Sequence, residues 1–164
     1  LQDRPLRLQP DTPSLPARGS AERRVPDGGG HRAPAEVARQ LALRTGDPVL
    51  QVKRVLTFSQ VPAILEEIWL PGVPFKGLTL ETLADDKGPM YALFETEFGT
   101  HMVRATERLR AVAADELSAK HLGVEQNTPL LAVERVSYTY GERPVEVRKA
   151  VYLTASHHYL NELN

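Results

Sequence analysis

The stretch 48–70, PVLQVKRVLTFSQVPAILEEIWL, predicts a β-hairpin. Residues 49–58 and 63–70 each carry apolar residues at alternate positions, a period that is typical of half-buried strands. The polar pair Ser59-Gln60 stands between the two runs as the turn. We therefore expect two antiparallel strands that place one face on a core.

A similar pattern recurs about 80 residues later in the chain. Each copy has a short helix, a polar turn with proline, an apolar strand that ends in Arg-Val, and a hairpin. The helices begin near Ala35 and Asp115, and the strands of the second hairpin are 130–140 and 144–154. Solenoid repeats have periods of about 20–50 residues, so we interpret the copies as two helix–hairpin units of one antiparallel sheet. Chance similarity between two such segments is the alternative.

Helices and one more strand are predicted outside the hairpins. Proline or glycine bounds most of these helices, as Pro34 and Gly123 do. The expected elements are a helix from 33 to a stop at 46–48, a short helix around 80–84, a helix from about 89 to 98, a strand at 101–112 and a helix at 115–122. Together they predict an α+β fold, a central antiparallel β-sheet with packed helices.

The first 32 residues differ from the rest of the chain. Five prolines punctuate them and Gly28-Gly29-Gly30 closes them, and both residue types disfavour regular elements. We interpret residues 1–32 as a linker, with an edge strand at most around 5–9, and residues 33–164 as the folded domain. A linker at this end implies a domain upstream, and an ordinary frayed terminus is the alternative.

Composition excludes several classes of function. The net charge of −1 gives no basis for non-specific binding to nucleic acid or acidic membranes. The absence of cysteine removes disulfides and thiolate chemistry, and it is compatible with a cytoplasmic location. No apolar run reaches the roughly 20 residues that span a bilayer, so we expect no membrane contact. The histidines lack metal-ligand spacing, and no phosphate loop or nucleophile elbow occurs, so we expect no metal, no cofactor and no catalytic residue.

Charged residues fall on the apolar faces of the predicted strands. Arg54 sits among apolar neighbours in the first strand, and Glu66 does so in the second. A buried charge costs several kcal/mol unless it is paired, so these residues either pair with each other or line a polar pocket for a charged ligand. Arg148 stands at the position of Glu66 in the second copy and shares a face with Glu146 and Tyr152. A structural pair and a binding site both stay open on this pattern.

A basic row lies on the predicted strand 101–112. It consists of Arg104, Arg108 and Arg110 at alternate or near-alternate positions. A solvated sheet edge and a contact with an anion are the two interpretations. The row has no interleaved aromatic residues, so it is a poor platform for nucleic acid.

Several short motifs follow one another in a specific order and spacing across residues 33–160. They are Pro48-Val49-Leu50 with Arg54-Val55, 61–67 (VPAILEE), Met90-Tyr91-Ala92-Leu93, Phe98-Gly99, Arg104-Ala105-Thr106-Glu107, Leu122-Gly123-Val124, 129–135 (PLLAVER), and Pro144-Val145-Glu146 before Tyr152. No single motif is diagnostic. Together they resemble the UTRA domain, the effector-binding domain of HutC-type GntR transcription regulators.

The resemblance implies a chorismate-lyase-like α+β fold and a sensor domain rather than an enzyme. Such domains bind a small-molecule effector, usually form a homodimer, and follow a winged helix-turn-helix domain, through which alone contact with DNA is expected. The linker would join the two domains. The resemblance also implies effector-binding positions, which match Arg54, Glu66, Tyr91, Glu146 and Tyr152, with Arg104, Glu107 and Arg148 as further candidates.

The chain departs from the pattern of sugar-phosphate-sensing relatives. Leu56 stands where they have a second arginine, and Pro89 stands where they have a serine. Both changes remove phosphate contacts, so we expect a smaller carboxylate or a more apolar effector. Because chorismate lyase shares the fold, an enzyme that acts on a small carboxylic acid is the alternative function.

Overall fold

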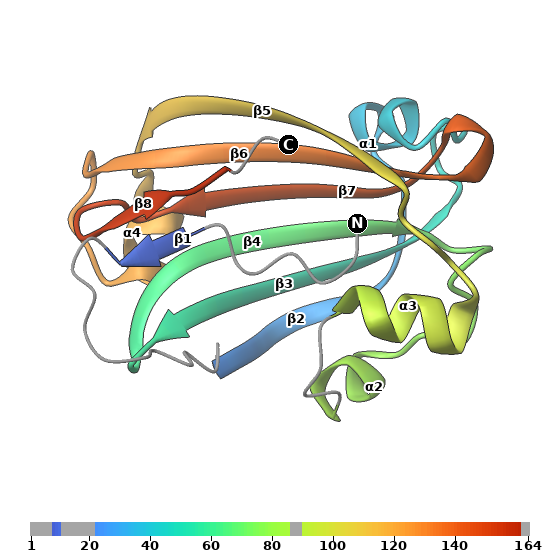
Figure 1. The fold of residues 1–164 in the computed structure, drawn as a ribbon, viewed down its shortest axis with the longest axis horizontal. Coiled ribbons are helices and arrows are strands. Elements are labelled where there is room, and N and C mark those ends of the chain that lie inside the picture. Colours follow the sequence, from blue (N-terminus) through green and yellow to red (C-terminus); the bar gives the residue numbers. More distant parts are fainter. Residues whose placement is uncertain (1–7, 11–21, 86–89, 162–164) are drawn as a thin grey trace.

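The computed structural model describes residues 8–10, 22–85 and 90–161. Their largest element is a curved six-stranded antiparallel sheet with the order β2-β3-β4-β7-β6-β5 (Figure 1). Its strands are β2 (Glu22–Arg32), β3 (Pro48–Phe58), β4 (Val61–Pro71), β5 (Arg104–Ala113), β6 (Pro129–Thr139) and β7 (Arg143–Tyr152). A two-stranded sheet joins β1 (Leu8–Pro10) to β8 (His157–Tyr159). The helices are α1 (Ala35–Gln40), α2 (Leu80–Asp85), α3 (Met90–Phe98) and α4 (Glu116–Leu122), and the α+β class is confirmed.

Both predicted hairpins are present. β3 and β4 turn at Ser59 and Gln60, whose φ angles of 48° and 67° lie in the left-handed region that two-residue hairpin turns use. β6 and β7 are joined by a 3₁₀ turn at Tyr140–Glu142. Since β4 pairs with β7, the two helix–hairpin units meet at the centre of one sheet, as the repeat predicts.

The expectation of no regular element in residues 1–32 is wrong for residues 22–32. They form the edge strand β2, which pairs with β3. The register is interrupted between Arg24 and Asp27, and a bulge in an edge strand accommodates Pro26, which has no N–H to donate. Pairing with a distant strand thus overrides weak local propensity. The strand expected around 5–9 corresponds in part to β1, and residues 1–7 and 11–21 lie outside the described residues.

Two boundaries near α3 also differ from the predictions. The predicted helix start at Pro89 lies outside the described residues, and the described helix begins at Met90. The strand predicted for 101–112 is observed as β5 from Arg104, because the chain after α3 first makes a turn in which Thr100 N–H donates to the Phe94 carbonyl at 3.0 Å. The short strand β8 was not predicted.

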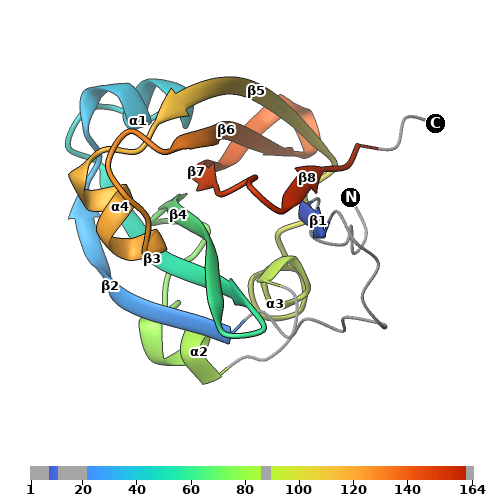
Figure 2. The same ribbon diagram turned by 90° about the vertical axis from the view of Figure 1, so that its left-hand side faces the viewer.

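Helices cover both faces of the sheet (Figure 2). On the face that we term the α3 face, Val52 and Ile68 pack with Leu83 of α2 and Phe94 of α3. On the opposite face, which we term the α1/α4 face, α1 packs on one apolar cluster and α4 on another. The first cluster contains Val49, Trp69 and Val147, and the second contains Leu65, Leu130 and Val151.

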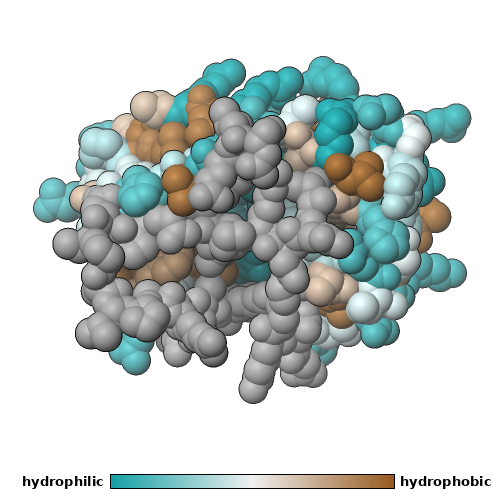
Figure 3. All heavy atoms as spheres, viewed as in Figure 1, coloured by the Kyte–Doolittle hydropathy of each residue, from teal (hydrophilic) through white to brown (hydrophobic). Residues whose placement is uncertain are grey.

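The exposed large hydrophobic residues are scattered along the chain, from Val61 to Leu160. On the face of Figure 3, the coloured part of the surface shows hydrophobic residues as separate patches between hydrophilic ones. No helix among the described residues combines the length and the apolar character that a bilayer crossing requires.

Candidate functional site

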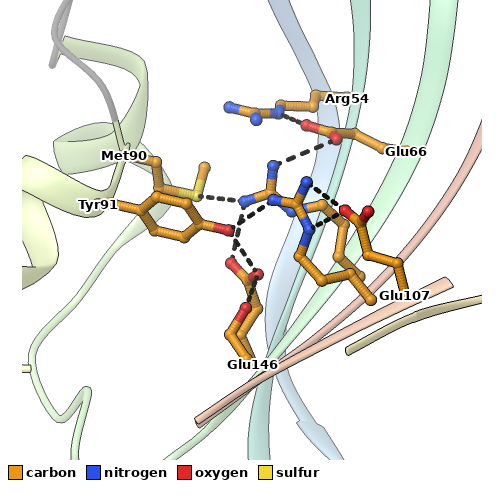
Figure 4. Close-up of polar contacts among 9 residues, drawn as sticks. Arg54, Glu66, Met90, Tyr91, Glu107 and Glu146 are labelled. Carbon is orange, nitrogen blue, oxygen red and sulfur yellow. Dashed lines mark hydrogen bonds and ion pairs between the residues drawn. The ribbon is translucent and has the colours of Figure 1, made fainter. Parts of the chain in front are cut away.

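Arginine and glutamate side chains gather on the α3 face, close to α3 (Figure 4). Strand register places them together, because residues directly opposite each other in antiparallel strands point to the same face. Arg54 lies opposite Glu66, and Arg135 lies opposite both Arg148 and Glu107. We term this set the arginine–glutamate cluster. It consists of Arg54, Glu66, Glu107, Arg135, Ser137, Glu146 and Arg148 of the large sheet, Tyr91 of α3 and Tyr159 of β8.

The buried half of the cluster is a chain of alternating charges. Arg54 Nε donates to Glu66 Oε1. Arg148 Nη1 lies 3.5 Å from Glu66 Oε2, and Arg148 Nη2 donates to Glu146 Oε2 at 2.9 Å. Glu66 and Glu146 are only 3% and 0% exposed, so each buried carboxylate depends on these guanidinium groups for its compensation.

The surrounding charges keep both Glu66 and Arg148 ionised. Burial raises the pKa of Glu66, but the nearby charges of Arg54 and Arg148 outweigh burial and hold the pKa below its ordinary value. Burial lowers the pKa of Arg148, but Glu146, Tyr91 and Glu66 outweigh it and hold the pKa well above the usual range. Glu66 is therefore ionised at neutral pH and held by two guanidinium groups.

The outer half of the cluster connects α3 and β8 to the sheet. Tyr91 Oη donates to Glu146 Oε1 at 3.1 Å and accepts from Arg135 Nη1 at 3.0 Å. Arg135 Nε donates to Glu107 Oε1 at 2.7 Å, and Tyr159 Oη donates to Glu107 Oε2 at 2.7 Å. These bonds form a continuous path from α3 through β6 and β5 to the last described strand.

Arg148 occupies the centre of the cluster and keeps one donor without an acceptor. Its Nε is buried and has no hydrogen-bond partner among the described residues. Its guanidinium lies 5.4 Å from the centre of the Tyr91 ring, and Nη2 lies 4.0 Å from Met90 Sδ. A buried donor without a partner costs about 1–3 kcal/mol, so this atom is suited to an incoming oxygen.

Six of the eight predicted site residues come together in the cluster. They are Arg54, Glu66, Tyr91, Glu107, Glu146 and Arg148. Tyr152 lies beside them on β7, buried, with its ring centre 5.9 Å from that of Tyr159. Burial and the nearby Glu66 raise the pKa of Tyr152 above its usual range, so its hydroxyl stays protonated.

Arg104 is the predicted residue that the structure does not bring to the cluster. It lies three positions before Glu107 on β5, and an odd separation along a strand places two side chains on opposite faces. Arg104 instead stacks on Tyr138, with Cζ 4.0 Å from the ring centre, and pairs with Glu142.

Sequence reasoning missed Arg135, Ser137 and Tyr159. The internal repeat carried a signal for Arg135, because it aligns the Arg-Val pair at Arg135 with the pair at Arg54. Ser137 donates to Glu146 at 3.2 Å from a position two residues further along the same face. Tyr159 gave no signal, since the strand that presents it was not predicted.

The cluster consists of groups that bind ligands through hydrogen bonds and ion pairs. No three His, Asp or Glu side chains among the described residues are grouped to hold a metal ion. The cluster joins three guanidinium groups, three carboxylates and tyrosine hydroxyls through hydrogen bonds and ion pairs. Such a site can exchange one of its own carboxylates for a carboxylate of a ligand.

Comparison with known proteins places this fold among bacterial regulators. A family model described as the UTRA domain matches residues 24–158. A crystal structure described as the ligand-binding domain of a GntR-family transcriptional regulator from Bordetella bronchiseptica is 51% identical, with a TM-score of 0.92 and full coverage of both chains.

Curated relatives agree with this result. The HTH-type transcriptional repressor PhnF of Mycolicibacterium smegmatis is 33% identical over 116 residues, which cover 71% of this chain and 46% of PhnF. The HTH-type transcriptional regulator Rv0792c of Mycobacterium tuberculosis is 31% identical over 118 residues, which cover 70% of this chain and 42% of that protein. The chain thus spans less than half the length of these relatives. They are transcriptional regulators and not enzymes, so the prediction of a regulatory domain is confirmed and the enzyme alternative is set aside.

Proposed function

The chain belongs to the UTRA domain family, and from this premise we propose that it senses a small anionic metabolite through the arginine–glutamate cluster. The observation that carries the proposal is Arg148, whose buried Nε lacks an acceptor among the described residues. A ligand oxygen at this position satisfies the donor, and the face of Tyr91 and the thioether of Met90 provide contacts for a less polar part of the ligand.

The charge balance of the cluster favours an exchange of carboxylates. Its three arginines are matched by three glutamates, so an added anion leaves an excess of negative charge unless one carboxylate withdraws. Glu107 is the most suitable to withdraw, because its side chain is 13% exposed whereas those of Glu66 and Glu146 are 2% and 0% exposed. We expect the ligand carboxylate to replace Glu107 on Arg135, which presents a planar fork to it.

This exchange provides a route from the ligand to the start of the chain. Glu107 accepts the hydroxyl of Tyr159, and Tyr159 lies opposite Leu8 in the pairing of β8 with β1. A ligand that moves Glu107 therefore changes the attachment of β1. We propose that the chain before β2 leads to a helix-turn-helix domain, that two copies act as a homodimer, and that the attachment of β1 sets the arrangement of the DNA-binding domains.

Thermal unfolding with defined probes tests the site. We expect glutarate or benzoate to raise the Tm of the protein, whereas the neutral analogues glutaramide and benzamide leave it unchanged. A ligand at 100 times its Kd adds about 2.7 kcal/mol to the free energy of unfolding. Arg135→Gln removes the shift, and the matched control Arg104→Gln retains it because Arg104 lies on the other face. A shift that survives in Arg135→Gln contradicts the proposal.

A further inference from the structure

A groove lies between α1 and α4 on the face opposite the arginine–glutamate cluster. It has a volume of about 940 Å³, within the range of small-molecule sites. Glu36, Arg39 and Gln40 of α1 form one wall, and Leu117, Ser118 and His121 of α4 form the other. In Figure 2 both helices lie on this side of the sheet, away from α3 and β8. The groove is thus separate from the site proposed above.

One half of the floor is a row of alternating charges. Each member lies directly opposite the next across neighbouring strands, and each is opposite in sign to its neighbour. Across the sheet the row is Lys53, Glu67, Lys149, Glu134 and Arg108. Opposite charges at facing positions stabilise a sheet modestly, so this row has a structural role of its own.

The other half of the floor is apolar and ends on a cation. On each of these strands it uses the residue two positions from the member of the charged row. Leu65 lies opposite Val151, Val151 lies opposite Ala132, and Ala132 lies opposite Arg110. The residues between the two rows also border the groove, but Arg54 and Glu66 among them direct their side chains to the other face. The floor therefore consists of an apolar strip beside a charged one.

Neither helix covers the apolar strip completely. Leu65, Ala132 and Val151 are only partly buried, and Leu117 of α4 is 59% exposed at the edge of the groove. Leu117 and the three residues of the strip line one groove, and apolar residues grouped in this way mark a site for a ligand or partner.

The cations of the groove are incompletely neutralised. Arg108 pairs with Glu134 at 3.2 Å, and Lys149 pairs with Glu36 at 3.3 Å. Arg39, Lys53 and Arg110 have no ion pair among the described residues. Without Arg54 and Glu66, five arginines and lysines and three glutamates line the groove, so it is locally positive on a chain with a net charge of −1.

We propose that this groove binds a small amphiphilic anion, with the apolar body on the strip of Leu65, Val151 and Ala132 and the anionic group at Arg110. Leu117 covers the body from α4. The strip crosses from β4 to β5, three strand spacings or about 14 Å, which is the length of an extended small molecule. The anionic group is a carboxylate, sulfonate or phosphate, since Arg110 with Arg108 two positions away provides the same donors to each.

Anilinonaphthalene sulfonate is a suitable probe, because it joins an apolar ring system to a sulfonate and its fluorescence rises in apolar sites. We expect saturable binding with one probe per chain. Arg110→Gln should raise the Kd about tenfold, since a hydrogen bond to a charged group is lost. Leu117→Glu should abolish binding, because it places a charged carboxylate against the apolar body of the probe. Both side chains are exposed, so both variants should fold, which their Tm values will show.

Matched controls make the test specific. Arg104→Gln removes an exposed arginine from the same face of β5, outside the groove, and should leave the Kd unchanged. Neutral phenylnaphthylamine should lose no affinity in Arg110→Gln. Arg135→Gln should leave the sulfonate affinity intact, which separates this site from the arginine–glutamate cluster. The proposal is overturned if Arg110→Gln and Leu117→Glu bind the probe normally. It is also overturned if Leu117→Glu lowers the oligomeric mass measured by sedimentation and leaves probe binding unchanged. The groove would then hold a second copy of the chain.

Discussion

Glu66 is a buried carboxylate whose charge depends on two arginines. Its pKa lies below the ordinary value of about 4.5 because Arg54 and Arg148 outweigh the effect of burial. The unfolded chain therefore binds a proton more readily than the native protein, and the free energy of unfolding falls as the pH drops below about 4.5. Above that value, the contribution of Glu66 is fully present.

Glu66→Gln should remove this part of the acid dependence. It should also cost roughly 3–5 kcal/mol at neutral pH, since a partner of buried charges is lost. Urea unfolding at several values between about pH 3.5 and 6.5 measures both effects. Equal slopes of stability against pH for the two proteins would show that Glu66 does not carry the charge inferred for it.

The β1–β8 pair is the element that joins the arginine–glutamate cluster to the start of the described chain. β8 has three residues, and Tyr159 of β8 donates to Glu107 of the large sheet. Tyr159→Phe removes this hydrogen bond to a carboxylate, which contributes about 1.5–3 kcal/mol. We expect faster amide hydrogen exchange at Leu8, at Gln9 and in 157–159, with global stability lowered by no more than that amount.

The amide hydrogen exchange rates of β3 and β4 serve as the internal reference for this measurement. Their amides lie in the centre of the large sheet and should exchange at unchanged rates. Uniform acceleration across both sheets would instead mean that Tyr159 supports the whole fold rather than the attachment of β1.

The molecule as a whole presents two different surfaces on one sheet. The arginine–glutamate cluster occupies the α3 face and the groove occupies the α1/α4 face, so the two lie back to back across β3, β4 and β7.

The regulatory response is tested in a protein that carries the helix-turn-helix domain. There, the acid that raises the Tm, glutarate or benzoate, should change operator affinity by 5- to 150-fold, or about 1–3 kcal/mol. Arg135→Gln should abolish this response, and Arg104→Gln should keep it. Operator affinity that is the same with and without the acid would separate ligand binding from regulation.

The sequence alone determined the two hairpins, the two helix–hairpin units and the α+β class. These follow from local periodicity and turn residues, as in 48–70, where alternation and Ser59-Gln60 suffice. It also identified Arg54 and Glu66 as a pair that needs compensation, because charges on apolar strand faces are costly.

Only the tertiary structure decided which charges meet. β2 exists because β3 pairs with it, although its own residues disfavour a strand. Arg135 joins the arginine–glutamate cluster and Arg104 does not, because the register of β5 with β6 assigns each to a face. The groove arises because α1 and α4 pack apart on the sheet. These outcomes depend on contacts between residues far apart in the chain, to which local sequence patterns are insensitive.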